Sequence, residues 1–382
     1  MESMAESSPK RRSLLALPAS VRRMSGWLLF LGLAAGVSIQ LQAETCTTQS
    51  QMVPVTRSAL SAAALSFAGW VKINDVAGIR ASTIPDVAQN FDGIAAAITS
   101  TAPKLAGEGL SVNSLYILDA SGNSGVKDTQ FYCSLNNSAA EVVFSLPALP
   151  AARYALAIVH ADGQNPWSLS FVLRESGSAW QLAGFISRPL TAAGHDGLWY
   201  WMQARIYAKQ NQQWNAWLYY TEADALLSPV DFVNSTNRDK LHAEQQAAQP
   251  KELATNGVSA EHPLQLDVCS HGMGRVVECM VALLCPADGC PKVSPPLPSY
   301  DFTALGTQES FDGKALELAV HITATEVGNP AAVRERNMKA LRVLLVNYPE
   351  LRTAFTGAWV YADAPGQSPF GLEFNPLPPA MP

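Results

Sequence analysis

One stretch of this sequence constrains the fold more than any other, because it is dense in aromatic residues. Residues 194–250 open with Gly-His-Asp-Gly-Leu-Trp-Tyr-Trp and continue through Trp-Asn-Ala-Trp-Leu-Tyr-Tyr at 214–220. The spacing of large and small residues there predicts two helices that form one hairpin. A buried aromatic side chain covers about 150–250 Å². A hairpin this rich in aromatics must therefore pack against neighbouring parts of the chain.

The order of large and small residues in this hairpin resembles one tetratricopeptide repeat. Its positions are occupied by Tyr200, Ala204, Tyr207, Ala216, Tyr220, Ala223 and the closing Pro229. Only one such unit is present, and a lone repeat cannot bury its apolar face by itself. A peptide-binding surface is the alternative, since aromatics also anchor interfaces. We expect a core that contains Trp199, Tyr200, Trp201, Tyr207, Trp214, Trp217, Tyr219 and Tyr220.

The N-terminus has the order of a secretory signal peptide. Basic residues at 10–12 and 22–23 precede a short apolar run, 27–39, and Leu-Gln-Ala follows at 41–43. This order predicts export and cleavage after Ala43, with a periplasmic or extracellular destination. The alternative is an uncleaved signal anchor, for which the run is short against the ~20 residues of a membrane span. We expect membrane contact only through this segment.

Composition and charge limit the classes of molecule that this chain is expected to bind. The chain has 382 residues, of which 48% are hydrophobic, so it is long enough to bury sizeable cores. Its net charge of −6 becomes more negative once the basic leader is removed. An acidic chain repels phosphate backbones, which argues against nucleic acid as a partner.

Two helical stretches open the exported part. The first, at 57–83, is rich in alanine and breaks at Asn74 and Asp75; the second starts after Ile84 and ends before Gly107. Short apolar or alternating runs follow and predict antiparallel strands. These runs are 115–118, 130–135, 141–146, 154–162, 167–174 and 179–187. Alternation places Tyr154, Leu156, Ile158 and His160 on one strand face, and likewise Trp167, Leu169, Phe171 and Leu173.

Helices followed by a long antiparallel meander predict an α+β domain with helices on one face of a sheet. With the helix break at 74–75 and the closing run Trp-Gln-Leu-Ala-Gly-Phe at 180–185, this plan resembles the cone-shaped NTF2-like superfamily over residues 50–188. The resemblance implies a curved sheet that often encloses a pocket, used by some members for isomerase or dehydratase chemistry and by many for binding alone. No acid/base motif of an enzymatic member is present, so the resemblance assigns no catalytic residue.

The C-terminal part predicts a helix packed on a small sheet. A polar helix capped within 234–236 runs to Gln246, and 246–250 is the best linker. A further helix starts at Asn329 and Pro330. Strands are expected at 264–268, 300–305, 316–325, 358–362 and 370–374. No family is recognised for this module.

The six cysteines are disulfide candidates, because export would place them in an oxidising compartment. Six cysteines allow fifteen connectivities, so the sequence fixes no pairing. Four of them lie near His271, which suggests a zinc site as the alternative, but no C-x-x-C pair is present and we expect no metal or other cofactor. We expect at least one disulfide within 269–290. The candidates are Cys46, Cys133, Cys269, Cys279, Cys285 and Cys290.

Two histidines could have either a catalytic or a structural role. His195 and Asp196 are adjacent, which suggests acid/base chemistry, but Asp196 better fits the N-cap of the helix that begins near Leu198. His160 lies at a strand end and is expected in the core or at the rim. If the NTF2-like domain holds a ligand pocket, its candidate residues are Trp70, Tyr116, His160 and Trp167.

These patterns support a domain plan but no assigned activity. We expect an exported binding or protein-interaction protein, with a protein or small molecule as its partner. The alternative is a pocket enzyme that acts on a small hydrophobic molecule, and a third possibility is an envelope-assembly factor. The plan is a signal peptide at 1–43, an NTF2-like α+β domain at 44–190, the hairpin and following helix at 191–250, an α+β module at 251–375 with a Cys-containing insertion at 269–299, and a Pro-rich tail at 376–382.

Overall fold

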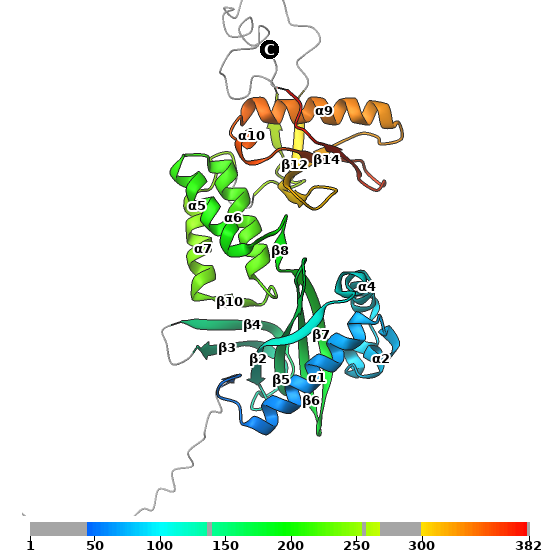
Figure 1. Cartoon of the computed structure of the whole chain (residues 1–382), viewed down its shortest axis with the longest axis vertical. Coiled ribbons are helices and arrows are strands. Elements are labelled where there is room, and N and C mark those ends of the chain that lie inside the picture. The colour runs from blue at the N-terminus through cyan, green and yellow to red at the C-terminus, as the bar shows by residue number, and fades with distance from the viewer. Residues whose placement is uncertain (1–43, 136–139, 254–256, 268–298, 380–382) are drawn as a thin grey trace, which may run out of the picture. The chain divides into compact units, whose positions relative to one another are not determined.

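The computed structural model describes residues 44–135, 140–253, 257–267 and 299–379, and these form an α+β fold (Figure 1). The leader at 1–43 and nearly all of the Cys-containing insertion lie outside the described residues. Within the described ranges, no helix is both long enough and apolar enough to cross a membrane.

The N-terminal helices begin and break where their local sequence predicts. The first helix ends before Asn74, whose φ of 56° cannot continue a helix, and Asp75 caps the next helix by accepting a hydrogen bond from Gly78 N at 2.9 Å. The stretch after Ile84 is not continuous, because it splits near Phe91 into two helices. The elements are α1 (Pro54–Lys72), α2 (Val76–Ala81), α3 (Pro85–Ala88) and α4 (Asp92–Thr101), followed by the 3-10 turn Ala102–Leu105.

The strands expected at 115–187 all form, but not as one meander. A five-stranded sheet has the order β1-β2-β5-β6-β7, and a separate three-stranded sheet has the order β10-β4-β3. The chain therefore leaves the large sheet after β2 and returns at β5. The large sheet contains β1 (Thr45–Thr48), β2 (Gly109–Asp119), β5 (Arg153–Asp162), β6 (Trp167–Ser176) and β7 (Ala179–Pro189); the small one contains β3 (Lys127–Ser134), β4 (Glu141–Leu149) and β10 (Val233–Ser235).

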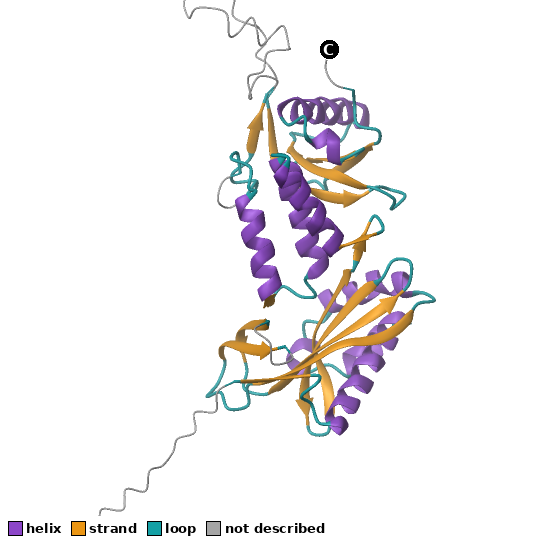
Figure 2. Ribbon diagram, turned by 60° about the vertical axis from the view of Figure 1, so that its left-hand side comes forward, coloured by secondary structure: helices purple, strands orange, loops and turns teal. Residues whose placement is uncertain are grey.

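The two faces of the five-stranded sheet belong to different hydrophobic clusters. Figure 2 shows the N-terminal helices gathered on one face. Leu169, Phe171 and Leu173 of β6 lie on that face and pack with Phe67 and Leu60 of α1. Alternate residues of β5 lie on the opposite face and pack with the three-stranded sheet: Tyr154, Leu156 and Ile158. The alternation in the sequence is confirmed for both strands.

A disulfide joins the two sheets. Cys46 of β1 is bonded to Cys133 of β3, with 5.4 Å between their Cα atoms and a sequence separation of 87. Closing a loop of that length restricts the unfolded chain, an effect of about 4–5 kcal/mol in the loop-entropy description. The other four cysteines, and with them the disulfide expected within 269–290, lie outside the described residues.

The aromatic stretch forms the expected helical hairpin. Its helices are α5 (Gly197–Lys209) and α6 (Gln213–Leu227), and α7 (Thr236–Ala247) follows. Asp196 is the N-cap of α5, since its Oδ1 accepts from Trp199 N at 2.8 Å. The His195 ring stacks on Trp199 at 3.7 Å between ring centroids. Capping and stacking thus account for the adjacent His and Asp.

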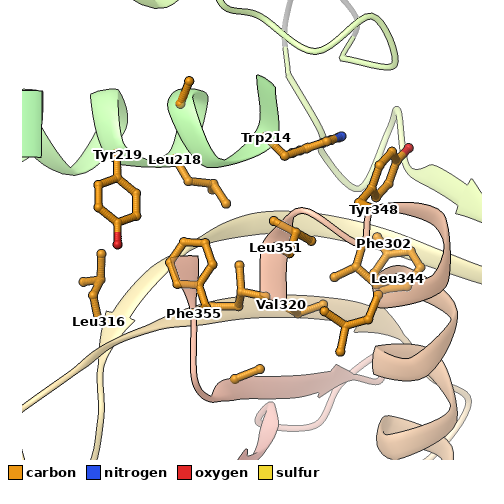
Figure 3. Packing of buried hydrophobic residues seen from close by; sticks show 14 of the residues in the cluster. Trp214, Leu218, Tyr219, Phe302, Leu316, Val320, Leu344, Tyr348, Leu351 and Phe355 are labelled. Carbon is orange, nitrogen blue, oxygen red and sulfur yellow. The ribbon is translucent and has the colours of Figure 1, made fainter. Parts of the chain in front are cut away.

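The hairpin packs on the C-terminal sheet. Of its eight aromatic residues, five are buried in the core, and Trp199, Tyr207 and Trp217 are partly buried against it. Figure 3 shows Trp214, Leu218 and Tyr219 of α6 facing side chains of that module. The Tyr219 and Phe355 rings lie 5.7 Å apart. One hydrophobic cluster spans both parts, and it includes Ala248 and Leu253 from the connection between them. The expected linker therefore lies against a shared core.

The C-terminal module is a five-stranded sheet with one long helix. Its strand order is β11-β12-β13-β14-β15, antiparallel except for the parallel pair β13 and β14, which α9 connects. Asn329 caps α9 by accepting from the backbone N of Ala331 and Ala332. The elements are β11 (Leu264–Leu266), β12 (Tyr300–Glu309), β13 (Leu316–Thr323), α9 (Pro330–Asn347), α10 (Leu351–Ala354), β14 (Ala358–Asp363) and β15 (Phe370–Phe374).

Candidate functional site

A cavity of about 330 Å³ lies on the face of the five-stranded sheet that the N-terminal helices do not cover. Its walls come from β2, β5, β6 and β7, from β4 and β10, and from the chain between the end of α6 and the start of α7. Most of the lining is apolar. The apolar and aromatic lining residues are Tyr116, Val142, Phe144, Leu156, Ile158, Pro189, Leu190, Leu226, Leu227, Pro229 and Val233.

Strand register brings three polar side chains of the lining into one row. His160 of β5 pairs with Ser168 of β6, which pairs in turn with Arg188 of β7. Residues paired across neighbouring strands project from the same face, with Cβ atoms about 5 Å apart. All three line the cavity. We call them the polar row, and we call the apolar lining residues the apolar wall.

Ser168 is the unusual member of the polar row. It is 2% exposed, and its Oγ has no hydrogen-bond partner among the described residues. Ser170, two residues along the same face, is also buried, but its Oγ donates to Pro229 O at 3.3 Å. Leaving a buried hydroxyl unpaired costs about 1–3 kcal/mol. An unpaired group beside a cavity is the kind that a bound molecule would satisfy.

The charged groups of the lining are two arginines. Arg238 is held on three sides, with Nε and Nη2 donating to Asp224 and Nη1 donating to Val233 O. Arg188 donates from Nη1 to Ser228 O at 3.1 Å and from Nη2 to Asp231 Oδ1 at 2.5 Å. No carboxylate is among the described residues that line the cavity. The lining therefore presents two guanidinium groups, each paired with a carboxylate that lies outside the lining.

Burial shifts the pKa values of the other two titratable side chains of the lining, His160 and Tyr116. The pKa of His160 is lowered, chiefly because burial penalises the charged imidazolium, with Asp162 opposing the effect. Burial also raises the pKa of the Tyr116 phenol. Both side chains are therefore neutral at pH 7. The Tyr116 ring packs on Phe144 with 5.1 Å between ring centroids.

The structure separates the four candidate pocket residues into two pairs. Tyr116 and His160 line the cavity. Trp70 and Trp167 belong to the helix-covered face, where Trp70 meets the Phe67 ring edge-on and Lys104 Nζ lies 4.1 Å from the Trp167 ring centroid. No strand or helix brings the two pairs to one site. Trp70 and Trp167 pack in the cluster that fills the space under the helices.

Sequence reasoning missed Ser168 and Arg188. Ser168 alternates with the apolar residues of β6, and Arg188 is a charged residue near the end of β7. Polar residues within mostly apolar strands are the signal that could have drawn attention to them. Only the pairing of β5, β6 and β7 places them beside His160. In the ranges that the structure describes, no group of three His, Cys, Asp or Glu side chains is gathered as metal ligands would be.

Comparisons with protein-family models, with curated proteins and with solved structures find no match to this chain.

Proposed function

We propose that this protein is an exported binding protein that holds a small, largely apolar molecule in the cavity, without carrying out chemistry on it. Ligand sites in proteins are typically apolar cavities with a few converging polar groups. The apolar wall and the polar row have this composition. The observation that carries the proposal is the buried Ser168 hydroxyl, which borders the cavity and has no partner within the described residues.

Export is part of the proposal, and two observations support it. The order of basic, apolar and small residues over 10–43 is that of a signal peptide. The Cys46–Cys133 disulfide adds to this, because disulfides persist mainly in oxidising compartments. For residues 50–188 we propose an NTF2-like architecture, supported by the helices packed on one face of the five-stranded sheet.

The charged groups of the cavity favour binding over catalysis. Arginine keeps its charge over the whole accessible pH range, so neither Arg188 nor Arg238 can exchange a proton. His160 could act as a base, but among the described residues no hydrogen bond ties its ring to a carboxylate or hydroxyl that would orient it. The pocket-enzyme alternative would be supported by turnover that His160→Gln abolishes.

A probe-binding experiment tests the proposed function. N-phenyl-1-naphthylamine is neutral and fluoresces more strongly in apolar surroundings, so the mature chain should bind it with a rise in fluorescence. Ser114→Phe places a ring in the cavity, because Ser114 is half-buried and lines it, and should abolish the signal. Ser124→Phe is the matched control, since Ser124 is exposed and away from the cavity. Equal fluorescence from both variants would contradict the proposal.

A further inference from the structure

The polar row identifies the chemical class of the ligand. We propose that the cavity binds an amphipathic carboxylate with a single tail of medium length, held at its head by Arg188, Ser168 and His160 and along its tail by the apolar wall. This inference rests on the proposed function, because it requires the cavity to be a binding site. It adds the charge and the orientation of the ligand.

The sign of the charge follows from what the lining contains and lacks. The chain as a whole carries a net charge of −6, yet its cavity is lined by two guanidinium groups and by no carboxylate among the described residues. Charges interact more strongly in an enclosed, poorly hydrated space than in bulk water. The two arginines are paired with Asp231 and Asp224 outside the lining, so an anionic head is attracted by the remaining donors of Arg188 and not by a net positive charge. A cationic head finds no carboxylate among the described lining residues.

Arg188, more than Arg238, has donors to offer a ligand. Each nitrogen of Arg238 is already bonded, to Asp224 or to Val233 O. Arg188 makes two hydrogen bonds, and a guanidinium has five N–H donors. Its carboxylate partner, Asp231, is 88% exposed, so water screens that ion pair strongly. A ligand carboxylate can thus bind Arg188 without first breaking a buried ion pair.

Ser168 and His160 complete a site for a carboxylate head. The Ser168 hydroxyl lies next to Arg188 in the row and has a free donor within the described part of the chain. A neutral imidazole presents one N–H donor and one acceptor. Hydrogen bonds to an ionised acceptor are about twice as strong as those between neutral groups. The row therefore discriminates a carboxylate from an alcohol of the same length.

The rest of the lining limits the size and number of apolar tails that the cavity can hold. Leu156 and Ile158 continue the β5 face away from His160, and the packed rings of Tyr116 and Phe144 close that side. A volume of about 330 Å³ lies at the lower end of the range known for ligand sites. It suits one tail and leaves no space for a lipid with two.

Titration calorimetry of the mature, disulfide-bonded chain tests the inference with three probes of equal tail length. Decanoate should bind at least about tenfold more tightly than 1-decanol, since one charge-assisted contact accounts for that ratio. Decyltrimethylammonium should show no binding. If 1-decanol binds as tightly as decanoate, the carboxylate inference fails while the proposed function stands. If none of the three binds, both fail.

Variants of the polar row separate recognition from folding. Arg188→Gln should weaken decanoate about tenfold and leave 1-decanol unchanged. Arg174→Gln is the control, because it removes the same charge from β6 at a position that does not line the cavity. If Arg188→Gln does not fold, Ser168→Ala provides the same test, with a severalfold loss expected for decanoate alone. Equal losses for the acid and the alcohol would overturn the assignment.

Discussion

The two faces of the five-stranded sheet are made by the same strands but are packed differently. On the helix-covered face, Leu169 and Phe171 pack into a continuous cluster with α1. On the opposite face, Leu156 and Ile158 border a cavity that ends in polar side chains. Close packing gains the most stability, because every buried atom has neighbours on all sides. The difference suggests that one face stabilises the domain and that the other gives up some packing for a binding site.

Truncating one leucine on each face tests this comparison most directly. Leu169→Ala should lower the free energy of unfolding by about 3–5 kcal/mol, because it opens a new cavity in a filled cluster. Leu156→Ala should cost about 1 kcal/mol less, since Leu156 already lacks neighbours on its cavity side. Urea unfolding with unchanged m-values measures both. Equal costs would mean that the two faces are packed alike.

Stabilities on the two faces have to be compared at one pH, because a buried carboxyl elsewhere makes unfolding pH-dependent. Glu317 of β13 is fully buried, and burial together with nearby Glu373 raises its pKa to about 7. The folded chain thus keeps a proton that the unfolded chain loses near pH 4.5. The stabilisation is complete below pH 4.5 and is lost as pH rises through 7. The loss amounts to about 3 kcal/mol.

Glu317→Gln isolates this contribution, since glutamine keeps the shape and cannot ionise. Relative to the wild type, the variant should gain stability between pH 5 and pH 8 in urea unfolding. Glu335→Gln on α9 is a suitable control because Glu335 is exposed. Parallel stability curves for the wild type and Glu317→Gln would show that Glu317 titrates alike in both states.

The smallest expected changes in stability come from substituting two serines on the cavity face. Ser168→Val replaces an unpaired buried hydroxyl with a methyl group, adds a second methyl group beside the cavity, and should stabilise the ligand-free protein by up to about 1 kcal/mol. Ser170→Val removes the donor to Pro229 O and should destabilise it by about 1 kcal/mol. Thermal unfolding distinguishes the two signs. A loss of stability in both variants would indicate that the Ser168 hydroxyl is satisfied in the free protein.

Two of the four residues that the sequence proposes for a pocket, Tyr116 and His160, line the cavity, and strand geometry explains why the other two lie elsewhere. Alternation shows that Leu156 and His160 share a face, and that Trp167 and Leu169 share one. It does not show which face the helices cover, so the pattern cannot separate Trp167 from His160, which lie on opposite faces of the sheet. For Trp70 of α1, likewise, the local sequence does not show which face of the sheet the helix covers. Ser168 and Arg188 join His160 only through pairing between strands, which no local pattern records.

The sequence by itself determined the type and ends of most elements and the burial of the aromatic hairpin. Capping by Asp196 and Asn329 and the periodicity of apolar residues depend on neighbours a few positions away, so they can be read locally. Tertiary structure alone decided that β2 pairs with β5, that Cys46 meets Cys133, and that a cavity lies opposite the helices. These depend on contacts between distant segments, where many pairings satisfy the same local pattern and only the packing of the whole fold selects one.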